Sequence, residues 1–165
     1  MKRLLFALLL VGTATVQVTL LPRANPLEVG PDLVLGLVLV SSSLGGVAAG
    51  MIWAALAGFA LDFLTLEPLG SHGLGLLLVA VIGGLAHRRL FRSDLVSPMG
   101  LVILATLASH LVAVALQWAL GTRPPIDVVL RVAGLTALLN VAVVPLVYGA
   151  IVALERSGMR RAPSR

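Results

Sequence analysis

The stretch from Leu33 to Leu61 reads LVLGLVLVSSSLGGVAAGMIWAALAGFAL and contains no charged residue. It is longer than the roughly 20 apolar residues that one membrane-spanning helix needs, and shorter than two full spans. Three consecutive serines and then Gly45-Gly46 lie in its middle, as a tight turn between two short helices would need. The stretch therefore predicts a helical hairpin inside a membrane.

The composition supports this prediction. Of the 165 residues, 59% are hydrophobic and only 12% are charged, whereas a soluble domain carries about 25% charged residues. The chain has no cysteine, which excludes a disulfide framework and a thiolate metal site. Aromatic residues make up 4%, too few for a surface that stacks on nucleic-acid bases. We therefore expect no nucleic-acid partner, no metal and no cofactor.

Apolar runs on both sides of this hairpin, separated by loops rich in Pro and Gly, indicate a bundle of about six transmembrane helices. The predicted fold class is an all-α integral membrane protein, with one domain over residues 1–155 and a basic cytoplasmic tail over 156–165. The predicted helices cover residues 4–21, 33–44, 46–66, 74–87, 98–120 and 127–154.

Two local features concern the loop before residue 33 and the apolar run over residues 4–21. Asp32 stands directly before the second helix, where its carboxylate is a good N-cap. A cleavable signal peptide is the alternative for the first run, because Gly12-Thr13-Ala14 resembles a cleavage site. The run continues to Leu21, which favours a retained helix.

The distribution of Lys and Arg predicts the topology. With six spans and a cytoplasmic N-terminus, nine of the 12 Lys and Arg residues lie on the cytoplasmic side, as the positive-inside rule requires. If residues 33–61 formed a single span, the basic cluster after the fourth helix would face outward. The prediction is a multi-pass protein of the bacterial inner membrane with both termini cytoplasmic. The cytoplasmic residues are Lys2, Arg3, Arg88, Arg89, Arg92, Arg156, Arg160, Arg161 and Arg165.

Small residues recur every four positions along the third helix and form one stripe on its surface. Small residues at this spacing let two helix backbones approach closely in a membrane. The stripe predicts either internal packing against another helix of the same chain or a face that binds a partner or a second copy. Its members are Gly46, Gly50, Ala54, Gly58 and Asp62.

Asp62 ends this stripe, and apolar residues continue beyond it to Leu66. A carboxylate inside the membrane is costly and is a functional-site hypothesis by default. The alternative places Asp62 at the membrane interface, where it accepts hydrogen bonds from amides of the following turn around Pro68-Leu69-Gly70.

Other polar residues within predicted spans include Gln17, His110 and Asn140. Hydrogen bonds between helices explain them more simply than a proton relay or a small-solute site would. The sequence contains no phosphate-binding loop, no paired metal ligands on one helix and no nucleophile elbow. We therefore expect a protein that is not an enzyme.

Several of these motifs, taken together, resemble the rod shape-determining protein MreD family. The resemblance spans about residues 17–86, and the Gly58/Asp62/Pro68-Leu69-Gly70 group is its most specific part. Helices five and six match only in hydropathy. The residues that carry it are Gln17, Thr19-Leu20-Leu21-Pro22, Pro31-Asp32-Leu33, Gly46, Gly50, Gly58, Asp62 and Pro68-Leu69-Gly70.

This resemblance implies a non-enzymatic membrane scaffold of the bacterial cell-elongation (rod) complex. Such a protein would bind the single-span protein MreC in the lipid bilayer. It would thereby help couple the MreB cytoskeleton to the glycosyltransferase and transpeptidase of peptidoglycan synthesis and so control cell shape.

A second hypothesis follows from architecture. The predicted bundle is similar to the substrate-binding subunits of energy-coupling-factor transporters, which would make the chain a small-solute-binding subunit. Gln17, His110 and Asn140 would then have to converge on one cavity. The Ala-x-x-x-Ala docking motif of those subunits is not matched, because Val11 follows Ala7 by four residues. An ion channel is a third and weaker alternative.

Overall fold

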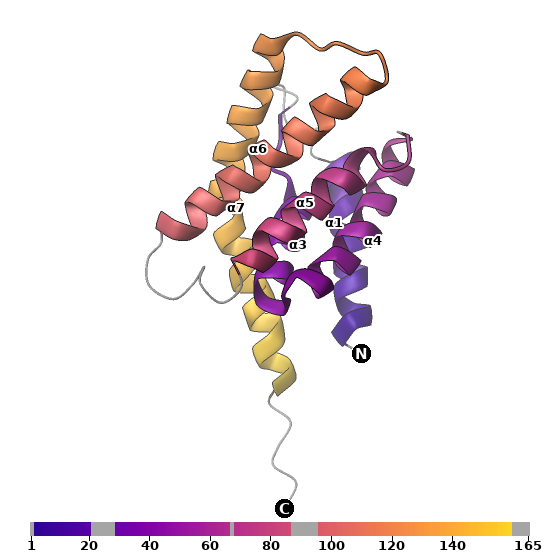
Figure 1. Ribbon diagram of the computed structural model, residues 1–165. Helices are drawn as coiled ribbons and strands as arrows, with labels where there is room; N and C mark the ends of the chain where they lie inside the picture. Colours follow the sequence, from indigo (N-terminus) through magenta and orange to yellow (C-terminus); the bar gives the residue numbers. More distant parts are fainter. Residues whose placement is uncertain (1, 21–28, 67, 87–95, 160–165) are drawn as a thin grey trace, which may run out of the picture.

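The computed structural model describes residues 2–20, 29–66, 68–86 and 96–159, and this part of the chain forms six helices and no strand. The predicted all-α fold is confirmed. In chain order the helices are α1 (Lys2–Thr19), α3 (Leu33–Gly45), α4 (Val47–Thr65), α5 (Ser71–Leu85), α6 (Val96–Ala119) and α7 (Ile126–Met159). They pack into one bundle, in which α6 lies alongside α5 and crosses α7 (Figure 1).

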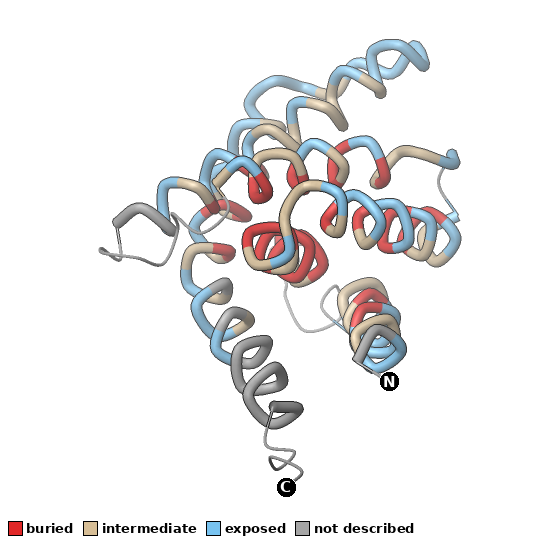
Figure 2. Tube along the Cα trace, turned by 60° about the horizontal axis from the view of Figure 1, so that its bottom comes forward, coloured by how far each residue is buried: buried red, intermediate tan, exposed pale blue. Residues whose placement is uncertain are grey.

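The short helix α3 is the centre of the bundle. It contacts all five other helices, and Figure 2 shows it as the most continuously buried part of the chain. Its run from Val34 to Val40 is buried on every side of the helix. A helix that is apolar all round is suited to this position, since no face of it has to meet water.

The chain reverses direction between α3 and α4. Gly46 has φ +84°, which favours glycine, and its N–H donates to the Ser42 carbonyl at 2.7 Å. The hydroxyls of Ser41, Ser42 and Ser43 each donate to a carbonyl three residues earlier, so the serines are satisfied without leaving the helix. The hairpin expected within residues 33–61 is therefore present, with Gly46 between its two helices.

The helices differ from the predicted bounds at the start of α5 and at the end of α7. The sequence placed its start at residue 74, because Gly70 and Gly73 were assigned to a loop. The helix begins at Ser71, directly after Gly70, which has φ +96°. Gly73 lies within the helix and packs against Gly58 of α4. At the other end of the chain, α7 continues to Met159, beyond the predicted residue 154.

Within the described part of the chain, three segments are long and apolar enough to cross a membrane: Val47–Thr65, Met99–Ala119 and Ile126–Val147. Shorter apolar helices cover Leu4–Thr19, Leu33–Gly45 and Ser71–Leu85. Large apolar side chains such as Phe63, Leu111 and Leu146 are more than two-thirds exposed. An outer surface of this kind is suited to lipid.

Candidate functional site

The small-residue stripe of α4 is filled by other helices of the same chain. Gly50, Ala54, Gly58 and Asp62 are all buried, and Gly46 is half-buried in the turn. A Cβ atom added at Gly58 would overlap the Gly73 Cα and lie 2.8 Å from the Gly73 nitrogen. Because the backbones of α4 and α5 touch here, the structure supports internal packing as the role of the stripe.

A second row of small residues on α5 completes this contact, and sequence reasoning missed it. A Cβ added at Gly84 would lie 2.6 Å from the Val47 nitrogen of α4, whereas one added at the neighbouring Gly83 would lie 2.7 Å from the Leu39 carbonyl oxygen of α3. The signal was present in the spacing of Gly73, Ala80 and Gly84, which are seven and four residues apart. Two complementary rows therefore hold α4 against α5 along their full length.

Asp62 caps the start of α5 from the end of α4. One carboxylate oxygen accepts from the Gly70 N–H at 2.6 Å. The other accepts from the His72 N–H at 2.8 Å and lies 2.9 Å from the His72 Nδ1. The side chain is only 1% exposed, and hydrogen bonds to a buried carboxylate are among the strongest in proteins. This geometry supports the structural alternative for Asp62, in which it orders the turn before α5.

The family motif loop contributes to the same cap. The Pro68 carbonyl accepts from both the N–H and the hydroxyl of Ser71. Gly70 donates its N–H to Asp62, whereas the Leu69 side chain is 76% exposed. Glu67 and the basic residues Arg88, Arg89 and Arg92 lie outside the described residues.

A second polar cluster joins four helices around Asp32, which precedes α3. The Asp32 Oδ1 accepts from the Leu35 N–H at 2.9 Å, which confirms the predicted N-cap. The same oxygen accepts from Gln17 Nε2 of α1 at 3.0 Å. The Asp32 N–H donates to Asn140 Oδ1 of α7 at 2.7 Å, and Asn140 Nδ2 donates to the Thr106 hydroxyl of α6 at 3.0 Å. The cluster therefore fixes the positions of α1, α6 and α7 relative to the central helix.

Two of the three predicted polar residues thus meet, and the third lies nearby. Gln17 binds the carboxylate of Asp32 and Asn140 binds its backbone N–H, so both amide groups are used in helix contacts. His110 is bonded instead to its own helix, with Nδ1 3.0 Å from the Thr106 carbonyl. The solute-binding hypothesis required the three side chains to line one cavity, and the pocket described below is lined by His110 but not by Gln17 or Asn140. Sequence reasoning also did not identify His72 or Thr106 as members of the polar clusters.

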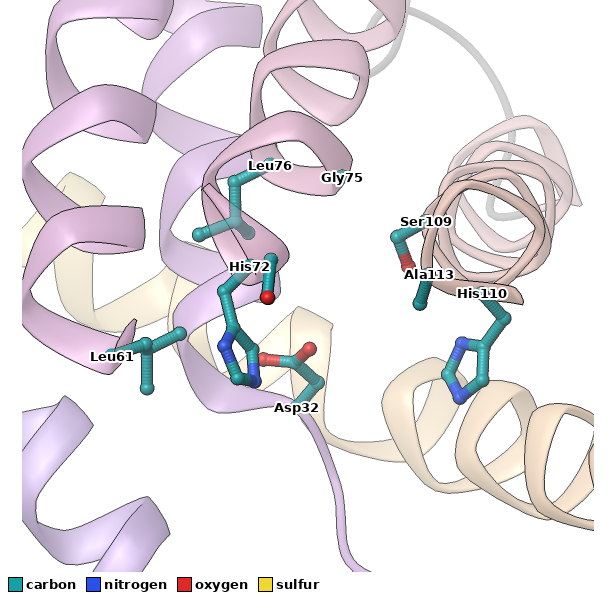
Figure 3. Close-up of a pocket in the computed structure, with 9 residues that line it drawn as sticks. Asp32, Leu61, His72, Gly75, Leu76, Ser109, His110 and Ala113 are labelled. Carbon is teal, nitrogen blue, oxygen red and sulfur yellow. The ribbon is translucent and has the colours of Figure 1, made fainter. Parts of the chain in front are cut away.

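A pocket of about 110 Å³ lies between the starts of α3 and α5 and the middle of α6. Figure 3 shows Asp32 between His72 on one side and Ser109 and His110 on the other. The described residues contain no group of three or more His, Cys, Asp or Glu that could hold a metal ion. The remaining lining residues are Leu61, Ser71, Gly75, Leu76 and Ala113.

Comparison with known families decides the identity of the chain. The family model described as rod shape-determining protein MreD matches residues 1–154. The chain belongs to the MreD family. This match includes α6 and nearly all of α7, where the sequence resemblance rested on hydropathy alone.

No curated protein and no solved structure matches the chain. Family membership and the apolar helices together identify an integral membrane protein with a role in rod shape determination. The MreD family is a family of structural membrane proteins and is not known as an enzyme family.

Proposed function

We propose that this MreD-family chain is a scaffold of the cell-elongation complex that binds the transmembrane helix of MreC without catalysing a reaction. The observation that carries the proposal is how the described polar side chains of the bundle are used. Asp62 accepts three hydrogen bonds that fix the start of α5, and Gln17 and Asn140 fix the start of α3. Bonds of this kind make a bundle rigid and let it present fixed outer surfaces.

The structure changes which surface we assign to the partner. The α4 stripe is occupied by α5, so a partner helix must dock elsewhere. Gly12 of α1 and Gly134 of α7 are exposed, and a Cβ added at either would meet no atom within 4 Å. Each has large exposed apolar neighbours on its own helix, such as Leu8 and Leu138. A small residue among large ones lets a partner helix approach closely in a bilayer.

The proposed topology has six spans with both termini in the cytoplasm. Reversal of the chain at Gly46 and packing of α4 along α5 support it. The helices α3 and α5 have 13 and 15 residues, which corresponds to roughly 20–23 Å at 1.5 Å per residue. Local thinning of the bilayer, at a modest cost per Å, would accommodate them.

Through MreC, the chain would be coupled to the glycosyltransferase, the transpeptidase and MreB.

The experiment that tests the proposal is affinity copurification of MreC with the tagged chain from membranes, using wild type, Gly12→Leu and Gly134→Leu. We expect wild type to retain MreC and at least one variant to lose it at unchanged apparent melting temperature. Absence of MreC from an intact wild-type bundle would show that the proposal is wrong.

A further inference from the structure

The pocket beside Asp32 presents hydrogen-bond acceptors almost exclusively. Its polar lining comes from Asp32 before α3, from Ser71 and His72 of α5, and from Ser109 and His110 of α6. What such a pocket can bind depends on where the hydrogens of these groups point. Three of these five side chains donate their hydrogen to a backbone carbonyl, which can only accept a hydrogen bond.

The three groups are Ser71, Ser109 and His110. The Ser71 hydroxyl donates to the Pro68 carbonyl at 2.7 Å, and the Ser109 hydroxyl donates to the Thr106 carbonyl at 2.8 Å. His110 Nδ1 lies 3.0 Å from the same Thr106 carbonyl, so Nδ1 carries the hydrogen and Nε2 of the neutral ring is an acceptor. Each of these side chains therefore has only lone pairs left for a ligand.

Asp32 adds a negative charge to this set. Its Oδ1 accepts from Gln17 and Leu35. Within the described part of the chain, Oδ2 accepts no hydrogen bond, and no Lys or Arg forms an ion pair with Asp32. A partly buried carboxylate is most stable when a cation or a strong donor reaches it.

The backbone offers little to an anion at this place, although two helices begin here. At the start of α3, the N–H groups of Val34 and Leu35 are taken by Gln17 and Asp32. At the start of α5, the N–H groups of Ser71 and His72 are taken by Pro68 and Asp62. The usual attraction of a helix N-terminus for anions is therefore already satisfied by the protein's own groups.

We infer that this pocket binds a cation that carries N–H donors, namely a primary ammonium group. Three such hydrogens can be shared among the Asp32 carboxylate, the serine hydroxyls and His110 Nε2. At roughly 30 Å³ for each water-sized group, the pocket has room for an ammonium with one or two carbon atoms. A quaternary ammonium has the same charge but no N–H, so it leaves the acceptors unpaired. The source is the ethanolamine headgroup of phosphatidylethanolamine or a free primary amine.

The test uses the purified full-length chain in detergent, with methylammonium and tetramethylammonium chloride at equal concentration as probes. We expect methylammonium, and not tetramethylammonium, to raise the apparent melting temperature. Asp32→Asn keeps an oxygen for the Leu35 N–H and removes the charge, and should weaken methylammonium binding by about tenfold or more. Asp127→Asn, an exposed aspartate in the first turn of α7, is the matched control and should bind as wild type does.

A second variant is needed because Asp32→Asn could change the folding of the bundle as well as ligand binding. Ser109→Ala removes one acceptor whose hydroxyl bonds only its own helix, and should weaken methylammonium binding severalfold. Ser41→Ala removes a hydroxyl of the same kind from the end of α3 and should have no effect.

The lipid arm of the test distinguishes the two sources. Native mass spectrometry after extraction from mixed phosphatidylethanolamine and phosphatidylcholine membranes reports which headgroup is retained. Retention of phosphatidylethanolamine that Asp32→Asn abolishes assigns the site to lipid, and stabilisation by methylammonium without lipid preference assigns it to a free amine. Equal effects of the two ammonium probes, or effects that neither Asp32→Asn nor Ser109→Ala changes, would overturn the inference.

Discussion

Adding a single methyl group at Gly58 should loosen the whole contact between α4 and α5. The Cβ of Gly58→Ala would overlap the Gly73 Cα and lie 2.8 Å from the Gly73 nitrogen. Both neighbours belong to the backbone of α5, so no side chain can rotate away and the two helices must move apart. Overpacking of this kind costs about 1–3 kcal/mol, and we expect the upper part of that range here.

The intrinsic preference of alanine for a helix offsets part of this loss. Alanine is more favourable than glycine in a helix by about 1 kcal/mol, which leaves a net destabilisation of about 2 kcal/mol. For a chain of this length, the apparent melting temperature should then fall by about 4–8 °C. The measurement is thermal unfolding of the purified chain in one detergent, followed by the loss of the monodisperse peak in size-exclusion chromatography.

Gly134→Ala is the matched control for this experiment. It makes the same substitution inside a helix, at an exposed position where the new Cβ meets no atom within 4 Å. Its melting temperature should equal or slightly exceed that of wild type. If Gly58→Ala melts at or above the temperature of Gly134→Ala, the backbone contact between α4 and α5 is not as close as the structure has it.

Three further predictions concern the polar clusters and the topology. Asp62→Ala should lower the free energy of unfolding by about 3 kcal/mol, because the backbone N–H groups of Gly70 and His72 and the His72 ring lose the carboxylate that they share. Asp127→Ala, at an exposed site, should change the free energy of unfolding little. Equal losses of stability in the two variants would contradict the capping role of Asp62. Gln17→Ala and Asn140→Ala should be coupled by more than about 0.5 kcal/mol in a double-mutant cycle, since both side chains bind Asp32; strict additivity would argue against one shared cluster. Reporters inserted at Arg92 or fused after Arg165 should read cytoplasmic, and an outward signal at either place would break the six-span topology.

The helical fold could be predicted because it depends on signals that are local in the sequence. Uncharged apolar runs mark the helices, and Gly46 and Asp32 mark their ends through backbone conformation and capping. The α4 stripe was also visible, since its period of four residues is a property of one helix. The helix that packs against this stripe could not be predicted, because the sequence of one helix does not indicate which other helix contacts it.

The start of α5 shows the limit of local signals most clearly. As glycines, Gly70 and Gly73 both indicate a loop in the sequence. Gly70 lies outside the helix with a positive φ, whereas Gly73 lies inside it. What separates them is the contact between Gly73 and Gly58, which joins two different helices. The cluster around Asp32 is of the same kind, because it depends on residues as far apart as Gln17 and Asn140.

In this account α5 covers the α4 stripe, and a partner helix therefore binds an exposed face of the bundle. Site-directed crosslinking tests this claim most directly. The chain has no cysteine, so single cysteines at Gly12, Gly134 and the fully buried Ala54 can be combined with a cysteine scan along the transmembrane segment of MreC and oxidised in membranes. We predict a disulfide to MreC from Gly12→Cys or Gly134→Cys and none from Ala54→Cys. A disulfide from Ala54→Cys, with none from the two exposed positions, would contradict the claim.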